Sequence, residues 1–323
     1  MIKKVLALVA VGFAAVIIFF AFAVTRKPRP VGGGPQPVSR DCHLKPIDQA
    51  GFDVIVVGGQ SNAVGYGAGD FSDPPFPNEN SRIFQMGRAD GNDGKIIPAV
   101  EPLEHWDRVK HKNDGRIGFA LPFARRYARK YLAPNRRVLI VPAAHGGTYL
   151  VLWAILENRP DLPDNFKILY PDMVRRTQAA LSASSATPLK NRIVAFLWHQ
   201  GENDVNGWIE DPKDPRNQII PNVDEYSARM KLLVESFRRQ FAEQNFVFLM
   251  GEIAHENHRG HPVREEFDSK MKSLAGELPC SGFVTSEGLE HNKGDLADLD
   301  HLDAKSLVEF GARYFKKFED ISN

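Results

Sequence analysis

The sequence predicts a single α/β domain built on a mostly parallel β-sheet. Short apolar, β-branched segments alternate with longer segments whose apolar residues recur at helical spacing. Because the short segments are apolar throughout, both faces of the sheet should be covered by helices. We expect the domain at residues 41–323, after an apolar segment at residues 1–25 and a linker at residues 26–40.

Each element follows from a local pattern. Strands are expected at residues 54–57, 138–142, 193–198, 246–250 and 282–284, and helices at residues 117–131, 170–181, 223–241, 263–278 and 305–318. Residues 70–116 are polar and rich in proline and glycine. We therefore expect a loop-rich excursion there, at the face of the domain that carries the active site.

The N-terminal segment has the composition of a membrane anchor. Lys3 and Lys4 precede an uncharged apolar run at residues 5–24, which is long enough to span a bilayer. We expect an uncleaved signal anchor, because the apolar region of a cleaved signal is shorter, about 7–15 residues. An A-x-A sequence at residues 21–23 keeps cleavage open as the alternative. The linker at residues 26–40 is rich in proline and glycine. The catalytic domain is expected outside the cytoplasm, in the periplasm or the extracellular space.

Charge and cysteine content limit the partners. The net charge of +1 and the absence of a basic stripe argue against a nucleic-acid partner. Cys42 and Cys280 are too few for a structural zinc site; an exported protein could pair them, and two free thiols are the equal alternative. One group of possible metal ligands falls on an expected surface loop: His255, Glu256, His258 and His261. We predict no metal site.

The first expected strand leads into a candidate nucleophile. It ends at Gly58-Gly59 and is followed by Gln60-Ser61-Asn62. Glycines let the backbone turn sharply and approach a substrate, and the N–H groups at the start of a helix favour an oxygen anion. Ser61 is therefore a candidate nucleophile, and the alternative is that Ser61 and Asn62 only cap a helix.

Polar residues also follow the next three expected strands. Gly146-Gly147-Thr148 follows the second, residues 200–204 follow the third, and Glu252 follows the fourth. Because ligands bind at the carboxyl ends of the strands in such sheets, we expect these residues to form one site.

A serine nucleophile needs a base and a group that orients it. His301 is the candidate base, on a polar loop before the last helix, and the D-x-x-H spacing lets Asp298 orient it. Asp300 and Asp303 compete for that role, and the alternative is that the aspartates solubilise the loop and cap the helix. We expect His145 and His199 to be structural.

The developing oxyanion of acyl transfer needs hydrogen-bond donors. The backbone N–H groups of Ser61 and of Gly146 or Gly147 suit this role, although the two glycines are equally typical of a tight turn. A side-chain amide from Gln200 or Asn203 would complete the set.

Four motifs occur in one order along the chain: G-Q-S-N at residues 59–62, G-G-T at 146–148 with Trp153 beyond, W-H-Q-G-E at 198–202, and D-x-x-H at 298–301. Together they resemble the SGNH-hydrolase superfamily, in its sialate O-acetylesterase and carbohydrate acetylesterase (acetylxylan esterase-like) branch. The resemblance spans residues 53–318, and four motifs in order are more specific than any one.

The resemblance implies a three-layer α/β/α sandwich of the flavodoxin-like type and a Ser–His–Asp mechanism without a cofactor. Ser61 would be the nucleophile, His301 the general base and then acid, and Asp298 its orienting partner. The substrates would be acetyl esters on sugars. We expect three further residues to contact the substrate: Gln60, Asn62 and Glu202.

Two positions depart from the pattern of this branch. Ala63 stands where methionine is frequent, and Asn203 stands where serine is frequent. Both Gln200 and Asn203 therefore stay candidates for the amide donor, and we favour Gln200 because it directly follows the strand.

Two other functions fit parts of the pattern. An α/β-hydrolase also has the order Ser, Asp, His, but its G-x-S-x-G motif is not present around Ser61. A membrane-anchored glycan-binding protein on an inactive esterase fold would have no need for Ser61, Asp298 and His301 together. The sugar and the oligomeric state stay open.

Overall fold

The computed structural model describes residues 41–69, 80–89, 91–106, 116–153, 168–184, 189–242, 244–294 and 299–323. The predicted signal anchor and linker, at residues 1–25 and 26–40, lie outside these ranges. In the helices that are described, we find none with the length and apolar character needed to cross a membrane.

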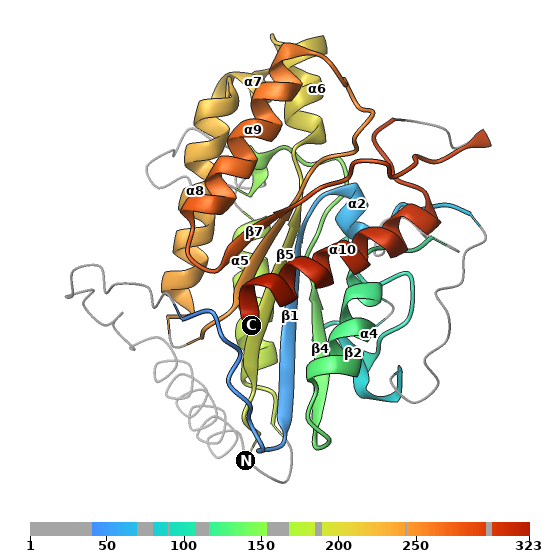
Figure 1. Ribbon diagram of the computed structural model, residues 1–323, viewed down its shortest axis with the longest axis vertical. Coiled ribbons are helices and arrows are strands. Elements are labelled where there is room, and N and C mark those ends of the chain that lie inside the picture. The colour runs from blue at the N-terminus through green and yellow to red at the C-terminus, as the bar shows by residue number, and fades with distance from the viewer. Residues whose placement is uncertain are drawn as a thin grey trace, which may run out of the picture. The chain divides into compact units, whose positions relative to one another are not determined.

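A twisted sheet runs through the centre of the domain (Figure 1). Its described strands are β1 (Gly51–Gly59), β2 (Ile83–Met86), β3 (Ile96–Pro98), β4 (Arg136–Pro142), β5 (Arg192–His199), β6 (Val247–Gly251) and β7 (Ser281–Val284). They are arranged in the order β3-β2-β4-β1-β5-β6-β7, and each neighbouring pair is parallel except the antiparallel pair β2–β3. The prediction of a mostly parallel sheet is confirmed.

The five strands predicted from the sequence are β1, β4, β5, β6 and β7. Numbered in chain order, they lie side by side as 2-1-3-4-5. This order places the topological switch point between β1 and β5, and ligands bind at the carboxyl ends of the strands at such a point.

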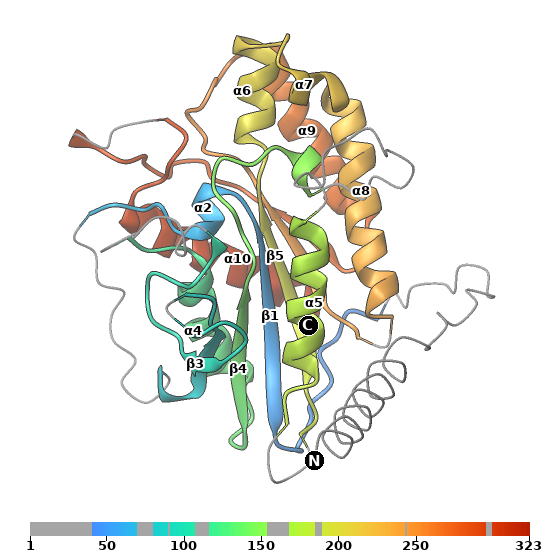
Figure 2. The same cartoon turned by 180° about the vertical axis from the view of Figure 1, so that it is seen from behind.

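Helices cover both faces of the sheet (Figures 1 and 2). One face carries α4 (Ala120–Tyr131) and α10 (Ala304–Ser322), and the other carries α5 (Leu169–Leu181), α8 (Val223–Gln240) and α9 (Pro262–Glu277). Successive residues of β1 point to opposite faces. Val54 and Val56 accordingly pack with α5 and α8, whereas Ile55 and Val57 pack with α4 and α10.

The prediction for residues 70–116 was wrong in one respect, because the described part of this stretch holds the strands β2 and β3. Both are short, and β3 ends at Pro98, which suits an edge strand. Their brevity leaves no periodic pattern in the sequence. The same reason explains two helices that were not predicted, α6 (Glu202–Glu210) and α7 (Pro215–Ile219).

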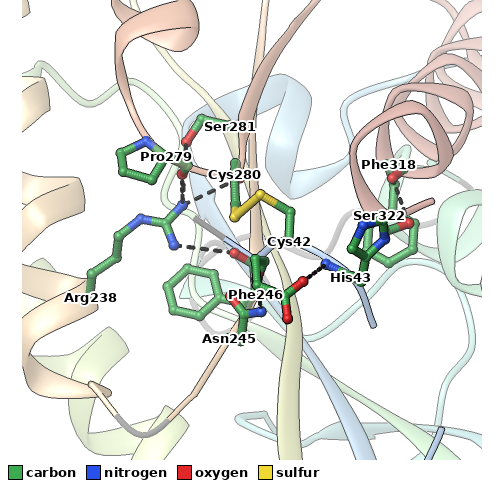
Figure 3. Close-up of a disulfide and its surroundings, with 11 residues drawn as sticks. Cys42, His43, Arg238, Asn245, Phe246, Pro279, Cys280, Ser281, Phe318 and Ser322 are labelled. Carbon is green, nitrogen blue, oxygen red and sulfur yellow. Dashed lines mark hydrogen bonds between the residues drawn. A yellow bond between two sulfur atoms is a disulfide. The ribbon is translucent and has the colours of Figure 1, made fainter. Parts of the chain in front are cut away.

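Cys42 and Cys280 form a disulfide, which decides between the two alternatives left open by the sequence (Figure 3). The bond ties the first described residues to the turn before β7 across 238 positions of sequence. Arg238 of α8 donates to the carbonyl oxygens of Pro279, at 2.6 Å, and Phe246, at 3.2 Å. The amino end of β7 is therefore held both covalently and by hydrogen bonds.

A buried charge cluster lies at the amino ends of the strands, opposite the expected site. The Asp53 carboxylate accepts hydrogen bonds from Arg136 at 2.7 and 2.9 Å, from Arg192 at 2.7 Å, and from the Tyr127 hydroxyl at 2.6 Å. Asp53 and Arg136 are fully buried. Each charge is thus desolvated and depends on its partners.

We predict that Asp53→Asn lowers the free energy of unfolding by about 3–5 kcal/mol, because it leaves Arg136 buried without a compensating charge. Urea denaturation measures this change, and the kcat of the folded fraction should not change. Glu225→Gln, which breaks the more exposed Arg229 pair at 2.7 Å, is the matched control; it should cost less than about 1 kcal/mol. Equal losses in the two variants would contradict the prediction.

Candidate active site

The carboxyl ends of β1, β4 and β5 lie together at one edge of the sheet. The backbone N–H of Gln60 donates to the carbonyl of His199 at 2.8 Å, and that of His145 donates to the carbonyl of Gly59 at 2.9 Å. Beyond β6, the Glu252 carbonyl accepts from the His199 ring at 3.0 Å. The segments that the sequence predicts to meet are therefore neighbours in the fold.

The turn that carries Ser61 requires glycine at its start. Gly59 has φ +123°, and a Cβ atom there would lie 2.0 Å from the carbonyl oxygen of His199. After this close crossing the chain enters the short helix α2 (Ser61–Val64), which ends at Gly65 with φ +101°. Ser61 is the first residue of that helix, and 3% of its surface is exposed.

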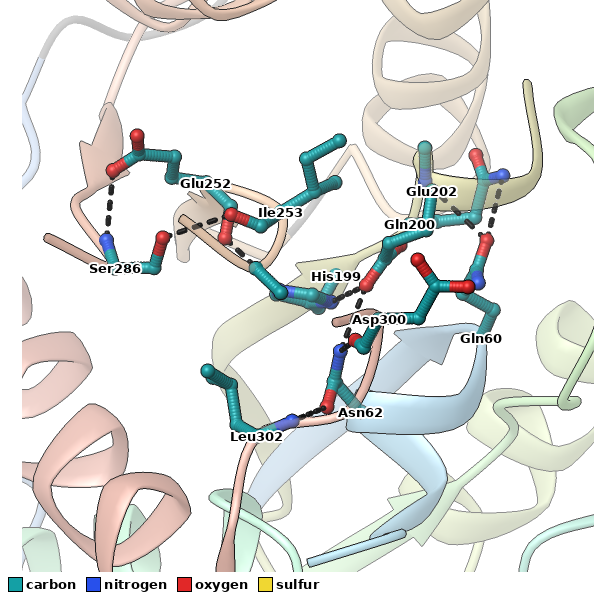
Figure 4. Close-up of polar contacts among 12 residues, drawn as sticks. Gln60, Asn62, His199, Gln200, Glu202, Glu252, Ile253, Ser286, Asp300 and Leu302 are labelled. Carbon is teal, nitrogen blue, oxygen red and sulfur yellow. Dashed lines mark hydrogen bonds and ion pairs between the residues drawn. The ribbon is translucent and has the colours of Figure 1, made fainter. Parts of the chain in front are cut away.

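Asn62 joins the serine turn to the loop that carries His301 (Figure 4). Its Nδ2 donates to the backbone carbonyl of Asp300 at 2.7 Å, and its Oδ1 accepts from the backbone N–H of Leu302 at 3.0 Å. The two bonded residues flank His301 on either side. Because Asn62 immediately follows Ser61, these bonds bring His301 to the serine turn.

His301 also has an aromatic neighbour. Its ring stacks on the Tyr66 ring with 5.0 Å between centroids and 20° between planes. The guanidinium of Arg116 lies over the same tyrosine ring, 5.0 Å from its centroid. A backbone bridge between Gly67 and Ile117 holds the two segments together. These contacts put a cation in the neighbourhood of the candidate base.

Gln60 orients Asn203. The Gln60 Oε1 accepts from Gln200 Nε2 at 3.2 Å and lies 3.5 Å from the backbone nitrogens of Gly201 and Asn203. Gln60 Nε2 then faces Asn203 Oδ1 and donates to it at 3.1 Å. The Asn203 amide nitrogen is turned away from Gln60, and it makes no hydrogen bond to any other described residue.

Gln200 is enclosed by hydrogen bonds. Its Nε2 donates to Asp204 Oδ2 at 2.6 Å and to the Thr148 carbonyl at 3.0 Å, in addition to Gln60. Its Oε1 accepts from the Tyr226 hydroxyl at 2.7 Å. An amide has two N–H hydrogens, so these contacts use its full donor capacity, and only 2% of the residue is exposed.

Three buried ionisable groups lie at the end of β5 and directly after it. Burial raises the pKa of Glu202 to about 7 and the pKa of Asp204 to about 7, and it lowers the pKa of His199 to about 4. Glu202 Oε1 accepts from Asn62 Nδ2 at 2.8 Å, and Asp204 accepts from the Leu150 N–H at 3.0 Å. Glu202 and Asn62, which we expected to contact the substrate, are both fully buried.

Two of the three candidate partners of His301 are engaged elsewhere. The Asp303 carboxylate caps α10 by accepting from the Ser306 N–H at 2.7 Å. The Asp300 carboxylate accepts from Asn206 at 3.1 Å and also from Asn257. Asp298 lies outside the described residues, so its predicted role as the orienting residue stays a prediction.

The loop after β4 brings Gly146 and Gly147 to the site. Gly147 is exposed and has φ +65°, a conformation that favours glycine. The loop is anchored by the Thr148 hydroxyl, which donates to the His145 carbonyl at 2.8 Å and accepts from the Trp153 indole at 3.0 Å. Through the bond from Gln200 to the Thr148 carbonyl, the loop lies against the segment after β5.

Several residues that support the site were not predicted from the sequence. Tyr66 and Arg116 lie outside the four motifs, and Tyr226 shows in the sequence only as part of the apolar face of α8. Asp204 follows Gln200 by four positions, which was the one available signal that it could bond that side chain. In the ranges that the structure covers, no group of histidine, cysteine or acidic residues could hold a metal ion.

Comparisons with known proteins agree on one family. The family profile described as "Carbohydrate esterase, sialic acid-specific acetylesterase" matches residues 51–320. A curated Escherichia coli (strain K12) protein, named "Probable 9-O-acetyl-N-acetylneuraminic acid deacetylase", is 30% identical over 222 residues, which are 59% of this chain and 61% of the relative. The chain thus spans about three fifths of the length of that relative.

Solved structures share the fold at lower identity. A protein from Arabidopsis thaliana has a TM-score of 0.59 and 22% identity, and the match covers 83% of this chain and 98% of that one. The structure of NanS has a TM-score of 0.58 and 21% identity, and the match covers 85% and 98%. A carbohydrate acetylesterase from Xanthomonas citri has a TM-score of 0.53 and 17% identity, and the match covers 84% and 56%.

Proposed function

The chain belongs to the sialic acid-specific acetylesterase family of carbohydrate esterases, and from this premise we propose that it removes O-acetyl groups from a sialic acid-containing carbohydrate. The observation that carries the proposal is that Asn62 hydrogen-bonds the backbone on both sides of His301. Its Nδ2 donates to the Asp300 carbonyl at 2.7 Å, and its Oδ1 accepts from the Leu302 N–H at 3.0 Å. These bonds support the proposed role of His301 as the general base, because nucleophilic catalysis requires a base beside the serine.

The proposed reaction has two steps. Ser61 Oγ attacks the acetyl carbonyl carbon while His301 takes the hydroxyl proton, and the bond to the sugar oxygen breaks as His301 returns that proton to it. Water then attacks the acetyl-enzyme with His301 again as base. This step releases acetate and restores Ser61. Asp298 would orient His301, which the D-x-x-H spacing supports, since Asp300 and Asp303 are engaged elsewhere.

For the oxyanion we propose Asn203 as the side-chain donor in place of Gln200, together with the backbone N–H groups of Ser61 and of Gly146 or Gly147. Gln200 has no N–H left for a substrate, because its amide already serves Asp204, Thr148 and Gln60. Asn203 is partly exposed, and Gln60 orients it so that its Nδ2 faces away from the protein network. A preorganised donor of this kind suits a charge that appears only in the transition state.

The positive charge of Arg116 near His301 favours an acidic sugar as the substrate over a neutral one such as xylan. Arg116 is half-buried and makes no ion pair with any carboxylate in the described part of the chain, and its guanidinium lies over the Tyr66 ring. A sialic acid carries a carboxylate, and guanidinium groups bind carboxylates in a bidentate manner.

We predict that Arg116→Gln raises the KM for an O-acetylated sialic acid by about tenfold or more, the cost of one charged hydrogen bond. The kcat/KM for an uncharged aryl acetate should stay within about twofold of wild type, since no carboxylate is present. Steady-state kinetics on the two esters measure the difference. An equal loss on both would assign Arg116 a structural role.

The disulfide supports a location of the domain outside the cytoplasm. A bond between Cys42 and Cys280 persists in an oxidising environment. We propose that the domain works outside the cytoplasm, anchored to the membrane by residues 5–24, and protease protection of the domain in intact cells and inverted vesicles tests this sidedness.

The experiment that tests the activity is acetate release by the full chain. The substrates are an aryl acetate, O-acetylated sialic acid and acetylated xylan, each assayed beside Ser61→Ala. We expect release from the first two that is lost in the variant. A folded protein that binds the sialic acid but never hydrolyses it would support a glycan-binding protein instead.

A further inference from the structure

His199 ends β5 with both ring nitrogens inside the protein. Its Nε2 lies 3.0 Å from the Glu252 carbonyl oxygen, and the residue is fully buried. A carbonyl can only accept, so Nε2 must carry a hydrogen. In a neutral imidazole the other nitrogen, Nδ1, is then an acceptor with no hydrogen of its own.

The nearest carboxyl oxygen lies beside Nδ1 without hydrogen-bond geometry, and Nδ1 has no hydrogen-bond partner among the described residues. Glu202 Oε1 lies 3.2 Å from His199 Nδ1, and the same oxygen accepts from Asn62 Nδ2 at 2.8 Å (Figure 4). Without a further proton, Oε1 and Nδ1 would be two acceptors in contact inside the protein, which is unfavourable. A carboxyl hydroxyl resolves this conflict, because a hydroxyl oxygen donates one hydrogen bond and accepts others.

We propose that Glu202 is protonated and donates from Oε1 to His199 Nδ1, and that this proton lets Glu202 and Asn62 hold the loop of His301 in place. Glu202 is then a positioning residue, since it acts through Asn62. The inference rests on the proposed function, because it assigns the His301 loop to catalysis.

The surroundings favour the neutral pair. Ionisable groups face it from several elements: Asp204 on α6, Tyr226 on α8, Arg264 on α9, Tyr314 on α10, Glu252 after β6, and Asp300 and His301 on the loop before α10. Burial is the largest cause that raises the pKa of Glu202 and lowers the pKa of His199. Asp300 also opposes ionisation of Glu202, whereas the hydrogen bonds from its own backbone N–H and from Asn62, and the neighbouring His301, favour it.

Loss of the proton should loosen the loop. An ionised Glu202 repels the Nδ1 lone pair of His199, and Asn62 must shift with the carboxylate to which it is bonded. The Leu302 N–H, which donates to Asn62 Oδ1 at 3.0 Å, should report that shift. Because burial raises the pKa of Glu202 to about 7, the change should occur as the pH rises through the neutral range.

The first test is NMR on Ser61→Ala protein with ¹⁵N-labelled histidine and backbone, which needs no enzymatic activity. At pH 6 we expect His199 as the neutral tautomer with hydrogen on Nε2. As the pH rises, the Nδ1 and Leu302 N–H signals should titrate together, and in the added variant Glu202→Gln neither should titrate. The proposal would be overturned if His199 were an imidazolium or an Nδ1–H tautomer at pH 6, or if the Leu302 N–H signal did not change with pH.

The second test is the pH profile of kcat/KM on an aryl acetate. Wild type should lose about tenfold as Glu202 ionises, the effect of one hydrogen bond. Glu202→Gln should be about tenfold lower but flat over that range, because one amide atom cannot both donate to His199 and accept from Asn62. Asp204→Asn, which removes a neighbouring buried carboxyl with other partners, should keep the alkaline fall.

The two tests separate two kinds of failure. An alkaline fall that survives in Glu202→Gln, or disappears in Asp204→Asn, would overturn the positioning role of Glu202. If wild type hydrolyses no acetyl ester, the proposed function fails, and the NMR titration still decides whether the Glu202 proton exists and controls the loop.

Discussion

Replacing Ser61 or His301 with alanine is expected to lower kcat for an aryl acetate by about 10⁴-fold or more, because members of a catalytic triad act as a unit. Without Ser61 no acyl-enzyme can form, and without His301 the hydroxyl keeps its proton. The double variant should be no slower than either single variant, since the second change removes nothing that still works.

Two matched replacements control for structural damage. Ser227→Ala removes a buried serine on α8, and His145→Ala removes a half-buried histidine that follows β4 at the same edge of the sheet. Both should keep kcat within about tenfold of wild type, because neither side chain takes part in proton transfer. If His145→Ala were as inactive as His301→Ala, the assignment of the base would be overturned.

Asn203→Ala is expected to reduce kcat by about 10²–10³-fold with little change in KM, the usual cost of losing one oxyanion donor. Asn203→Asp keeps an oxygen that can accept from Gln60 at 3.1 Å but replaces the N–H donor with a charged acceptor that repels the oxyanion, so its kcat should fall at least as far. The two variants should therefore lose kcat together. Steady-state kinetics on an aryl acetate, where substrate contacts are few, measure the effect.

Gln200→Ala should behave differently. It leaves Asp204, Tyr226 and Gln60 without their shared partner, which predicts a loss of about 1–3 kcal/mol or more in the free energy of unfolding. Well below the melting temperature, kcat should fall much less than in Asn203→Ala. The reverse pattern, with kcat lost in Gln200→Ala and kept in Asn203→Ala, would restore Gln200 as the donor.

The sequence predicted the sheet well because its strands are buried on both faces. The runs at residues 54–57, 138–142, 193–198 and 246–250 are apolar throughout, and a run of that kind is hard to accommodate anywhere but the centre of a covered sheet. The strands β2 and β3 were missed because a strand of three or four residues near the edge of a sheet does not have to be apolar on both faces.

The location of the site also followed from the sequence. Polar residues after successive parallel strands must meet, since parallel strands end at the same edge. Ser61, Gln200 and Asn203 were therefore expected together, and the bond from Gln60 N to the His199 carbonyl brings their segments into contact.

The sequence by itself thus determined the fold class, the edge of the sheet that carries the site and the residue types available there. Only the tertiary structure decided which side-chain amide has an N–H group available for a substrate. The N–H groups of Gln200 are bonded to partners up to 140 positions away in the sequence. It also decided that Asn62 and Glu202 are buried and that Cys42 pairs with Cys280. The physical reason is common to all three: hydrogen-bond capacity, burial and pairing depend on neighbours that are distant in the sequence.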